Sequence, residues 1–273
     1  MRQWLRGHLT TLSRMASAEH TVMSALALLV GLAGGFGAVG FRHLIDAVQR
    51  LAYGGDSALL HLVEHLPGYH ILLVPAIGGL IVGPLVYFYA AEAKGHGVPE
   101  VMDAVALKNG LIRKRLVVVK SLASAICIGT GGSVGREGPI VQIGSAIGSA
   151  IGQLLKVSAG RMRTLVGCGA AAGIAATFNA PIAGAMFSLE IILAEFGVAT
   201  FSPIVISAVV ATAVSRHYLG DIPAFTVPAY ELISVWEFPL YISLGLICGA
   251  VGVVFIRTLY ATEDLFDGIR FPE

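Results

Sequence analysis

The chain has 273 residues, of which 56% are hydrophobic and 13% are charged, and its formal net charge is +1. Soluble domains carry about 25% charged residues, so this composition, with a mean hydropathy of +0.80, excludes an ordinary soluble protein. It indicates an all-α polytopic membrane protein. The sequence has no basic stripe, and we therefore expect no nucleic-acid partner.

Residues 1–20 are basic and amphipathic, which predicts a cytoplasmic or interfacial helix at the N-terminus. Residues 22–41 follow without a charge and are long enough to span a bilayer. Their apolar pattern continues through Leu44 and Val48, so we expect a long, tilted helix. The basic N-terminus is expected on the cytoplasmic side of a plasma or inner membrane.

Residues 53–68 are expected to form an aqueous loop. Its His61 and His65 are four residues apart, but a metal site would need a further ligand that the loop does not offer. We therefore expect neither a metal site nor a cofactor. Residues 71–91 predict a second span, in which Pro75 and Pro84 imply kinks.

Glycine and proline interrupt the next apolar segment. The pentapeptide GHGVP at residues 95–99 predicts a turn followed by a helix of two to three turns, too short to cross a membrane. The helix is expected to end near Leu107, before a basic loop at residues 108–115 that is typical of a cytoplasmic connection. A short helix would then enter the membrane with its N-terminus inward.

A second interruption follows residues 116–134. The pentapeptide GREGP at residues 135–139 opens a helix that carries glycines at every fourth position. This row, formed by Gly144, Gly148 and Gly152, predicts close packing against another helix.

The apolar segment at residues 164–189 is interrupted by FNAP at residues 178–181. We expect two shorter helices, with Asn179 as a cap and Pro181 in the first turn of the second helix. That second helix is expected to end at Glu190.

The last part of the chain predicts a span at residues 196–215, a polar loop at residues 216–237, and a final helix that opens at residue 238 and can extend to Leu265. We expect a transmembrane domain over residues 21–268 and a truncated end at residues 269–273.

Arg136 and Glu137 lie side by side at the start of a helix in an apolar sequence. Such a pair costs several kcal/mol within a membrane unless it has partners or a task. Interrupted helices place their positive N-terminal ends inside the membrane, where free backbone N–H groups bind anions. Two such ends that converge would hold an anion weakly enough for it to leave again.

Four stretches of the sequence are similar to the CLC family of chloride channels and proton-coupled chloride transporters. GHGVP at residues 95–99 looks like the family's GSGIP segment, and GREGP at residues 135–139 matches its GREGP segment. Residues 178–190 resemble the helix that follows, and Lys120 is similar to a lysine in the helix that leads to GREGP. The order and spacing of these stretches make the resemblance specific.

The resemblance implies a CLC-type fold of short, interrupted and tilted helices that transports an anion, chloride first, across a lipid bilayer. Family members contain two inverted halves in one subunit and form homodimers with one pore per subunit. This chain looks like the first inverted repeat plus the first helix of the second. We therefore expect an incomplete transmembrane domain, a fragment that could need the missing half for transport.

The resemblance also implies roles for individual residues. Glu137 would be the gate, a tethered carboxylate that occupies the place of an anion until it is protonated or displaced. Two alternatives remain open for it, completing its own helix N-terminus or pairing with Arg136. Lys120 could reach the interface or a buried anion, and Glu190 could be a structural carboxylate. The implied anion-binding residues are His96, Gly97, Val98, Arg136, Gly138 and Ile140, and the implied proton-path or electrostatic residues are Glu190 and Lys120.

Two departures from the family pattern affect selectivity and coupling. His96 stands where the family has a serine. Its imidazole could donate an N–H to an anion and add pH dependence, or point away while the backbone binds, so nitrate and fluoride stay open beside chloride. Ile191 stands where coupled exchangers carry a second glutamate, which favours passive, channel-like conduction over proton-coupled exchange, the alternative.

An intramembrane enzyme is the remaining class to consider. Ser133 lies near Glu137, but no histidine stands at a useful spacing from it. We expect no enzymatic activity.

Overall fold

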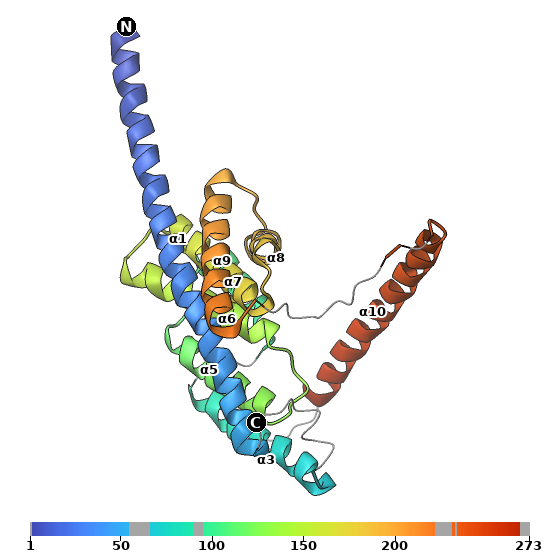
Figure 1. Ribbon diagram of the computed structural model, residues 1–273. Coiled ribbons are helices and arrows are strands. Elements are labelled where there is room, and N and C mark those ends of the chain that lie inside the picture. The colour runs from blue at the N-terminus through green and yellow to red at the C-terminus, as the bar shows by residue number, and fades with distance from the viewer. Residues whose placement is uncertain (1, 55–65, 90–94, 222–230, 233, 268–273) are drawn as a thin grey trace. The chain divides into compact units, whose positions relative to one another are not determined.

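The computed structural model describes residues 2–54, 66–89, 95–221, 231–232 and 234–267, with side chains from residue 20 onward (Figure 1). Every element within these ranges is a helix. The contacts divide the chain into two units, Met1–Ala224 and Phe225–Glu273, which are described separately. The predicted loop histidines His61 and His65 lie outside the described residues.

One helix, α1 (Arg2–Tyr53), replaces the two elements expected at the N-terminus. The expected interfacial helix continues into the first span without a break. The apolar part, His20–Tyr53, has 34 residues and measures about 51 Å at 1.5 Å per residue, whereas the hydrocarbon core of a bilayer is about 30 Å thick. This excess length agrees with the expected long helix.

Three further helices are long and apolar enough to cross a membrane. They are α3 (Gly68–Tyr89), α9 (Val198–Leu219) and α10 (Glu237–Asp267). Pro75 and Pro84 lie inside α3 without ending it. The final helix reaches Leu265, as the sequence allowed, and ends slightly beyond it at Asp267.

Shorter helices lie between these spans, as the glycine and proline interruptions predict. They are α4 (Val98–Leu107), α5 (Arg115–Gly129) and α8 (Pro181–Phe187), which continues as the π-helix η2 (Ser188–Leu193). With ten residues, α4 is only about 15 Å long. It is therefore too short to cross a bilayer by itself.

The structure corrects the expected role of Asn179. This residue adopts the left-handed conformation, with φ 57°, at the C-terminal end of α7 (Ala159–Phe178), and Ala180 is the N-cap of α8. Its side chain bonds Arg216 and Asp221, so it ties the turn to the end of α9. The second helix of this pair also runs through Glu190 to Leu193, because η2 extends it.

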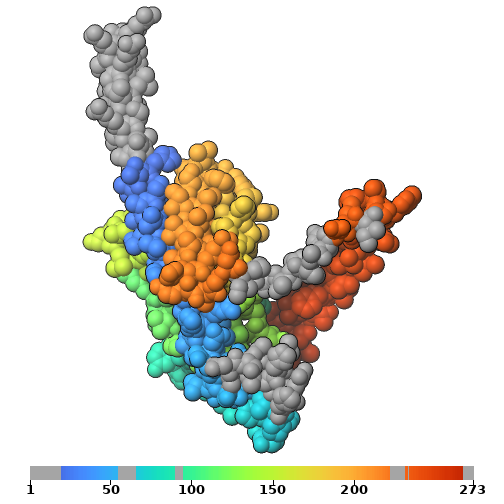
Figure 2. All heavy atoms as spheres, viewed as in Figure 1, coloured from blue at the N-terminus to red at the C-terminus, as the bar shows by residue number. Residues whose placement is uncertain are grey.

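The centre of the first unit is the packing of α6 (Glu137–Leu154) against α7. A Cβ atom on Gly144 would touch the carbonyl of Gly169, and one on Gly148 would touch the carbonyl of Leu165. The backbones therefore approach one another directly, which confirms the close-packing face predicted from the glycine row. Helices α1 and α9 also pack on α7 and along each other, and Figure 2 shows α9 in orange beside α1 in blue.

A polar cluster fixes the loop after α4 to α6. Ser149 Oγ accepts the Ile112 N–H at 2.9 Å and donates to the Gly110 carbonyl at 2.7 Å. The side-chain amide of Gln153 donates to the Ile112 carbonyl at 2.7 Å. These bonds satisfy buried loop groups, and they hold the C-terminal end of α4 at a set position relative to α6.

We predict that Gly148→Ala destabilises the fold by about 1–3 kcal/mol, because a methyl group forced against backbone atoms cannot be accommodated by a rotamer change. Gly40→Ala is the matched control. Its Cβ would meet no atom within 4 Å, so it should be neutral or slightly stabilising. Thermal unfolding in detergent measures both variants, and equal melting temperatures would contradict the packing described here.

Candidate functional site

The N-terminal ends of α4 and α6 meet backbone to backbone at Gly97 and Gly138. A Cβ atom on Gly97 would meet the carbonyl of Gly138, and a Cβ on Gly138 would meet the carbonyl of His96. Gly97 also has φ +98°, a conformation that side chains disfavour. The two interrupted helices therefore converge, and we call this contact the α4–α6 junction.

Glu100 caps the start of α4 from within its own first turn. Its Oε2 accepts the Gly97 N–H at 2.6 Å, and Pro99 occupies the second helical position. The first regular bond of the helix runs from the Val101 N–H to the Gly97 carbonyl at 3.3 Å. One carboxylate is thus held at the positive end of α4, where a helix favours negative charge.

The start of α6 leaves a different set of donors. Arg136 is the N-cap, and the Ile140 N–H donates to its carbonyl at 3.1 Å. Pro139 has no N–H group. The backbone N–H groups of the first turn that have no acceptor within the helix are therefore those of Glu137 and Gly138. Ile140 is buried beneath the junction and uses its N–H within the helix.

Glu137 is exposed and lies differently from Glu100. Its carboxylate folds back against the Cα of Gly135, where a Cβ would collide with it. Across the described part of the chain, this carboxylate forms neither a hydrogen bond nor an ion pair, and the alternative pairing with Arg136 is not observed. One carboxylate at the junction therefore has a hydrogen-bond partner, and the other has none among the described residues.

Lys120 supports the loop that precedes α4. The residue is only 5% exposed, and its Nζ donates to the Gly95 carbonyl at 2.9 Å. Its ammonium group also interacts electrostatically with Glu100. A cation of α5 thus sits under the junction and ties the GHGVP loop in place, instead of reaching the membrane interface.

The structure brings most of the predicted site residues to the junction and separates two from it. His96, Gly97 and Val98 form the α4 side, and His96 itself is exposed. Arg136 turns into another cavity, lined by residues of α1 and α7. Glu190 lies on η2 and is exposed.

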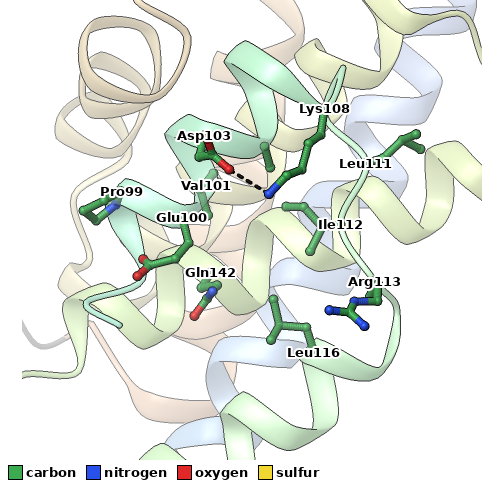
Figure 3. A pocket seen from close by; sticks show the side chains of 11 residues that line it. Pro99, Glu100, Val101, Asp103, Lys108, Leu111, Ile112, Arg113, Leu116 and Gln142 are labelled. Atoms are coloured by element: carbon green, nitrogen blue, oxygen red, sulfur yellow. Dashed lines mark hydrogen bonds and ion pairs between the residues drawn. The ribbon is translucent and has the colours of Figure 1, made fainter. Parts of the chain in front are cut away.

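A cavity of about 590 Å³ borders the junction on the side of α4. Figure 3 shows Glu100 of α4 and Gln142 of α6 within it, and the ion pair of Lys108 with Asp103 (2.7 Å) at its edge. The sequence reasoning missed Glu100 and Gln142. Glu100 stands three residues after Gly97, the position of the glutamate in a capping box, and this half of the motif could have revealed the first of them. Among the residues that the structure describes, no three metal-ligating side chains come together.

Most of the chain matches the model of a known family. The model of the voltage-gated chloride channel family matches residues 78–272. The chain belongs to this family. Among its relatives, a ClcB-like protein of Ralstonia nicotianae is 35% identical over 255 residues, which cover 92% of this chain and 59% of the relative. The chloride channel protein CLC-f of Arabidopsis thaliana is 35% identical over 259 residues, 89% of this chain and 32% of the relative.

Solved CLC structures share the fold. A slow cyanobacterial Cl⁻/H⁺ antiporter superposes with a TM-score of 0.78 at 26% identity, over 92% of this chain and 59% of the antiporter. A CLC-type fluoride/proton antiporter gives a TM-score of 0.75 at 25% identity, over 93% of this chain and 60% of that structure. This CLC chain therefore has the family's all-α membrane fold, as the motifs predicted, and spans about three-fifths of the length of these structures.

We predict that Gly138→Ala destabilises this CLC chain by about 1–3 kcal/mol, since its methyl group would force the two backbones apart at the junction. Gly135→Ala is the matched variant in the same pentapeptide. Its methyl group meets only the mobile end of Glu137, so stability should change little. Melting temperatures in detergent compare the two, and a Gly138→Ala protein as stable as Gly135→Ala would contradict the contact.

Proposed function

We propose that this protein carries a small inorganic anion, chloride first, across a membrane by way of the α4–α6 junction. The observation that supports this most is the convergence of two helix N-termini at Gly97 and Gly138. Their partial positive charges and first-turn N–H groups attract an anion without a full buried cation. Such a site binds weakly, and weak binding allows the ion to leave.

Glu137 is proposed as the gate. Its carboxylate is a tethered anion beside the first-turn N–H groups of α6, and it has no bond among the described residues that would hold it there. Protonation removes its charge, and an incoming anion can then take its place. Glu100 is less suited to this role, because its carboxylate is bonded to the Gly97 N–H.

Passive conduction is the proposed mode of transport, and proton-coupled exchange is the alternative. Ile191 in η2 carries no proton, although the family's exchangers have a glutamate at the corresponding position. Exchange is favoured by a different observation, namely that both solved relatives described above are antiporters. Water that reaches Glu137 from either side could carry protons without a second glutamate.

Two further properties belong to the proposal. His96, exposed beside the junction, is a candidate for tuning selectivity among halides and nitrate. The chain spans 59% of the length of its Ralstonia relative. Transport by the 273 residues alone should therefore be compared with transport by a longer chain that includes the downstream reading frame. A homodimer is expected by the same family resemblance.

For the gate, we predict that anion flux into liposomes rises as the pH falls, because protonation removes the charge of the tethered carboxylate. Glu137→Gln should give a high flux that no longer varies with pH, because its neutral amide imitates the protonated carboxyl. Glu195→Gln, an exposed carboxylate outside the junction, is the control. A pH dependence that survives in Glu137→Gln would remove Glu137 from the gate.

For the mode of transport, we predict a reversal potential set by the chloride gradient alone in planar bilayers. A pH gradient should leave it unchanged, because passive conduction moves no stoichiometric protons. A steady shift of the potential with the pH gradient would establish exchange instead. Robust flux from the 273-residue chain would exclude the alternative that this part is inactive by itself.

A further inference from the structure

The C-terminal end of α1 is bonded to the loop that leads into α6. Tyr53, the last residue of α1, is 8% exposed, and its hydroxyl donates to the carbonyl of Thr130 at 2.8 Å. Thr130 is the C-cap of α5, and the loop at residues 130–136 runs from it to the start of α6 at Glu137. A residue of the first span thus contacts, from 77 positions away in sequence, the segment that ends at the proposed gate.

The start of α3 packs on the same tyrosine. The ring of His70 lies 5.9 Å from the ring of Tyr53, measured between centroids, and its Nε2 lies 3.0 Å from the carbonyl oxygen of Ala52. The tyrosine therefore has a packing partner for its ring and an acceptor for its hydroxyl, the arrangement that a buried tyrosine requires. These two contacts together hold its side chain in one orientation.

Helix α3 also encloses the start of the loop. A Cβ atom on Gly78 of α3 would collide with the side chain of Thr130. A Cβ atom on Gly131 would meet the Tyr53 hydroxyl, with Pro75 of α3 next to it. Gly131 also has φ +90°, a conformation that side chains disfavour. Thr130 and Gly131 therefore lie between the end of α1 and α3, and we call this contact the Tyr53 clamp.

Two backbone bonds order the loop between the clamp and α6. The N–H of Gly132 donates to the carbonyl of Cys127, and the N–H of Val134 donates to the carbonyl of Gly132, both at 2.8 Å. The next residue is Gly135, and the carboxylate of Glu137 lies against its Cα. The clamp is therefore connected, through a short bonded segment, to the backbone on which the proposed gate rests.

We propose that Tyr53 is a positioning residue for Glu137. Its bond to Thr130 fixes the loop at residues 130–136, and the fixed loop keeps the carboxylate of Glu137 beside the first-turn N–H groups of α6. Without the bond the loop samples more conformations. The carboxylate then spends less time beside these donors, and an anion replaces it more easily. This inference rests on the proposed function for its flux measurement but not for its measurement of the loop.

Tyr53→Phe removes the hydroxyl and leaves the ring that packs on His70. Chloride flux at neutral pH should rise about 2- to 5-fold, the effect of losing one hydrogen bond between uncharged groups. In the Glu137→Gln background, the same substitution should leave flux unchanged, because no charged carboxylate remains to be positioned. A residue that served only stability would instead lower flux in both backgrounds.

The matched control is Tyr218→Phe. The ring of Tyr218 packs against Phe36 and His217, and its hydroxyl has no hydrogen-bond partner within the described part of the chain. Removing this hydroxyl should change neither flux nor the loop before α6.

The decisive experiment measures flux and amide hydrogen exchange on the same proteins. Flux into liposomes is recorded for the unmodified chain, for Tyr53→Phe, for Glu137→Gln and for the double variant. Exchange at residues 131–136 is followed by mass spectrometry, because loss of a local bond raises exchange where the backbone opens. Faster exchange in Tyr53→Phe, with higher flux only where Glu137 is present, is the expected result. Unchanged exchange in this loop, or an equal change of flux in both backgrounds, would overturn the positioning role.

The exchange measurement separates this inference from the proposed function. Equal flux in the unmodified chain and in Glu137→Gln would refute the gate, whereas faster loop exchange in Tyr53→Phe would still show that Tyr53 holds the loop. Flux that depends on Glu137, with no effect of Tyr53→Phe on exchange or flux, would keep the gate and refute this inference. Melting temperatures in detergent confirm that each variant is folded before the comparison.

Discussion

The contact between Gly97 and Gly138 is the constraint on which the rest of the site depends. Two helices that end inside an apolar protein can share one anion only if their N-terminal amides come within a few ångströms, and any side chain at these positions would prevent that approach. The surrounding structure enforces the contact from both ends of α4. Lys120 holds the loop before the helix, and the bonds around Ser149 hold the loop after it.

Within the described chain, some charged side chains around this contact have hydrogen-bond partners and one has none. The proposed mechanism depends on this difference. Glu100 and Lys120 have defined partners, so they set the geometry and the local field. Glu137 has neither a hydrogen bond nor an ion pair among the described residues, and this supports its proposed role as the gate. A gate needs this combination. The carboxylate and a chloride ion can compete for the same backbone N–H donors only if those donors stay in place.

Much of this arrangement could be predicted from local sequence, because glycine and proline report backbone breaks directly. The short helix after GHGVP and the close packing at Gly144 and Gly148 were predicted correctly. The continuity of α1 was missed, since a charge pattern does not mark a helix end. Asn179 was expected to cap the start of α8, but it lies at the C-terminal end of α7. Its side-chain partners lie about forty residues away, on α9 and just after it, where local sequence does not reveal them. The bond from Tyr53 to Thr130 depends wholly on tertiary packing, which no local pattern records.

The central claim is that an anion binds where the two helix N-termini meet, and anomalous diffraction from crystals of the Glu137→Gln protein soaked in bromide tests it most directly. The account predicts a bromide peak at the α4–α6 junction, within hydrogen-bonding distance of backbone N–H groups of both α4 and α6. Bromide that binds elsewhere in the protein while the junction remains empty would contradict it.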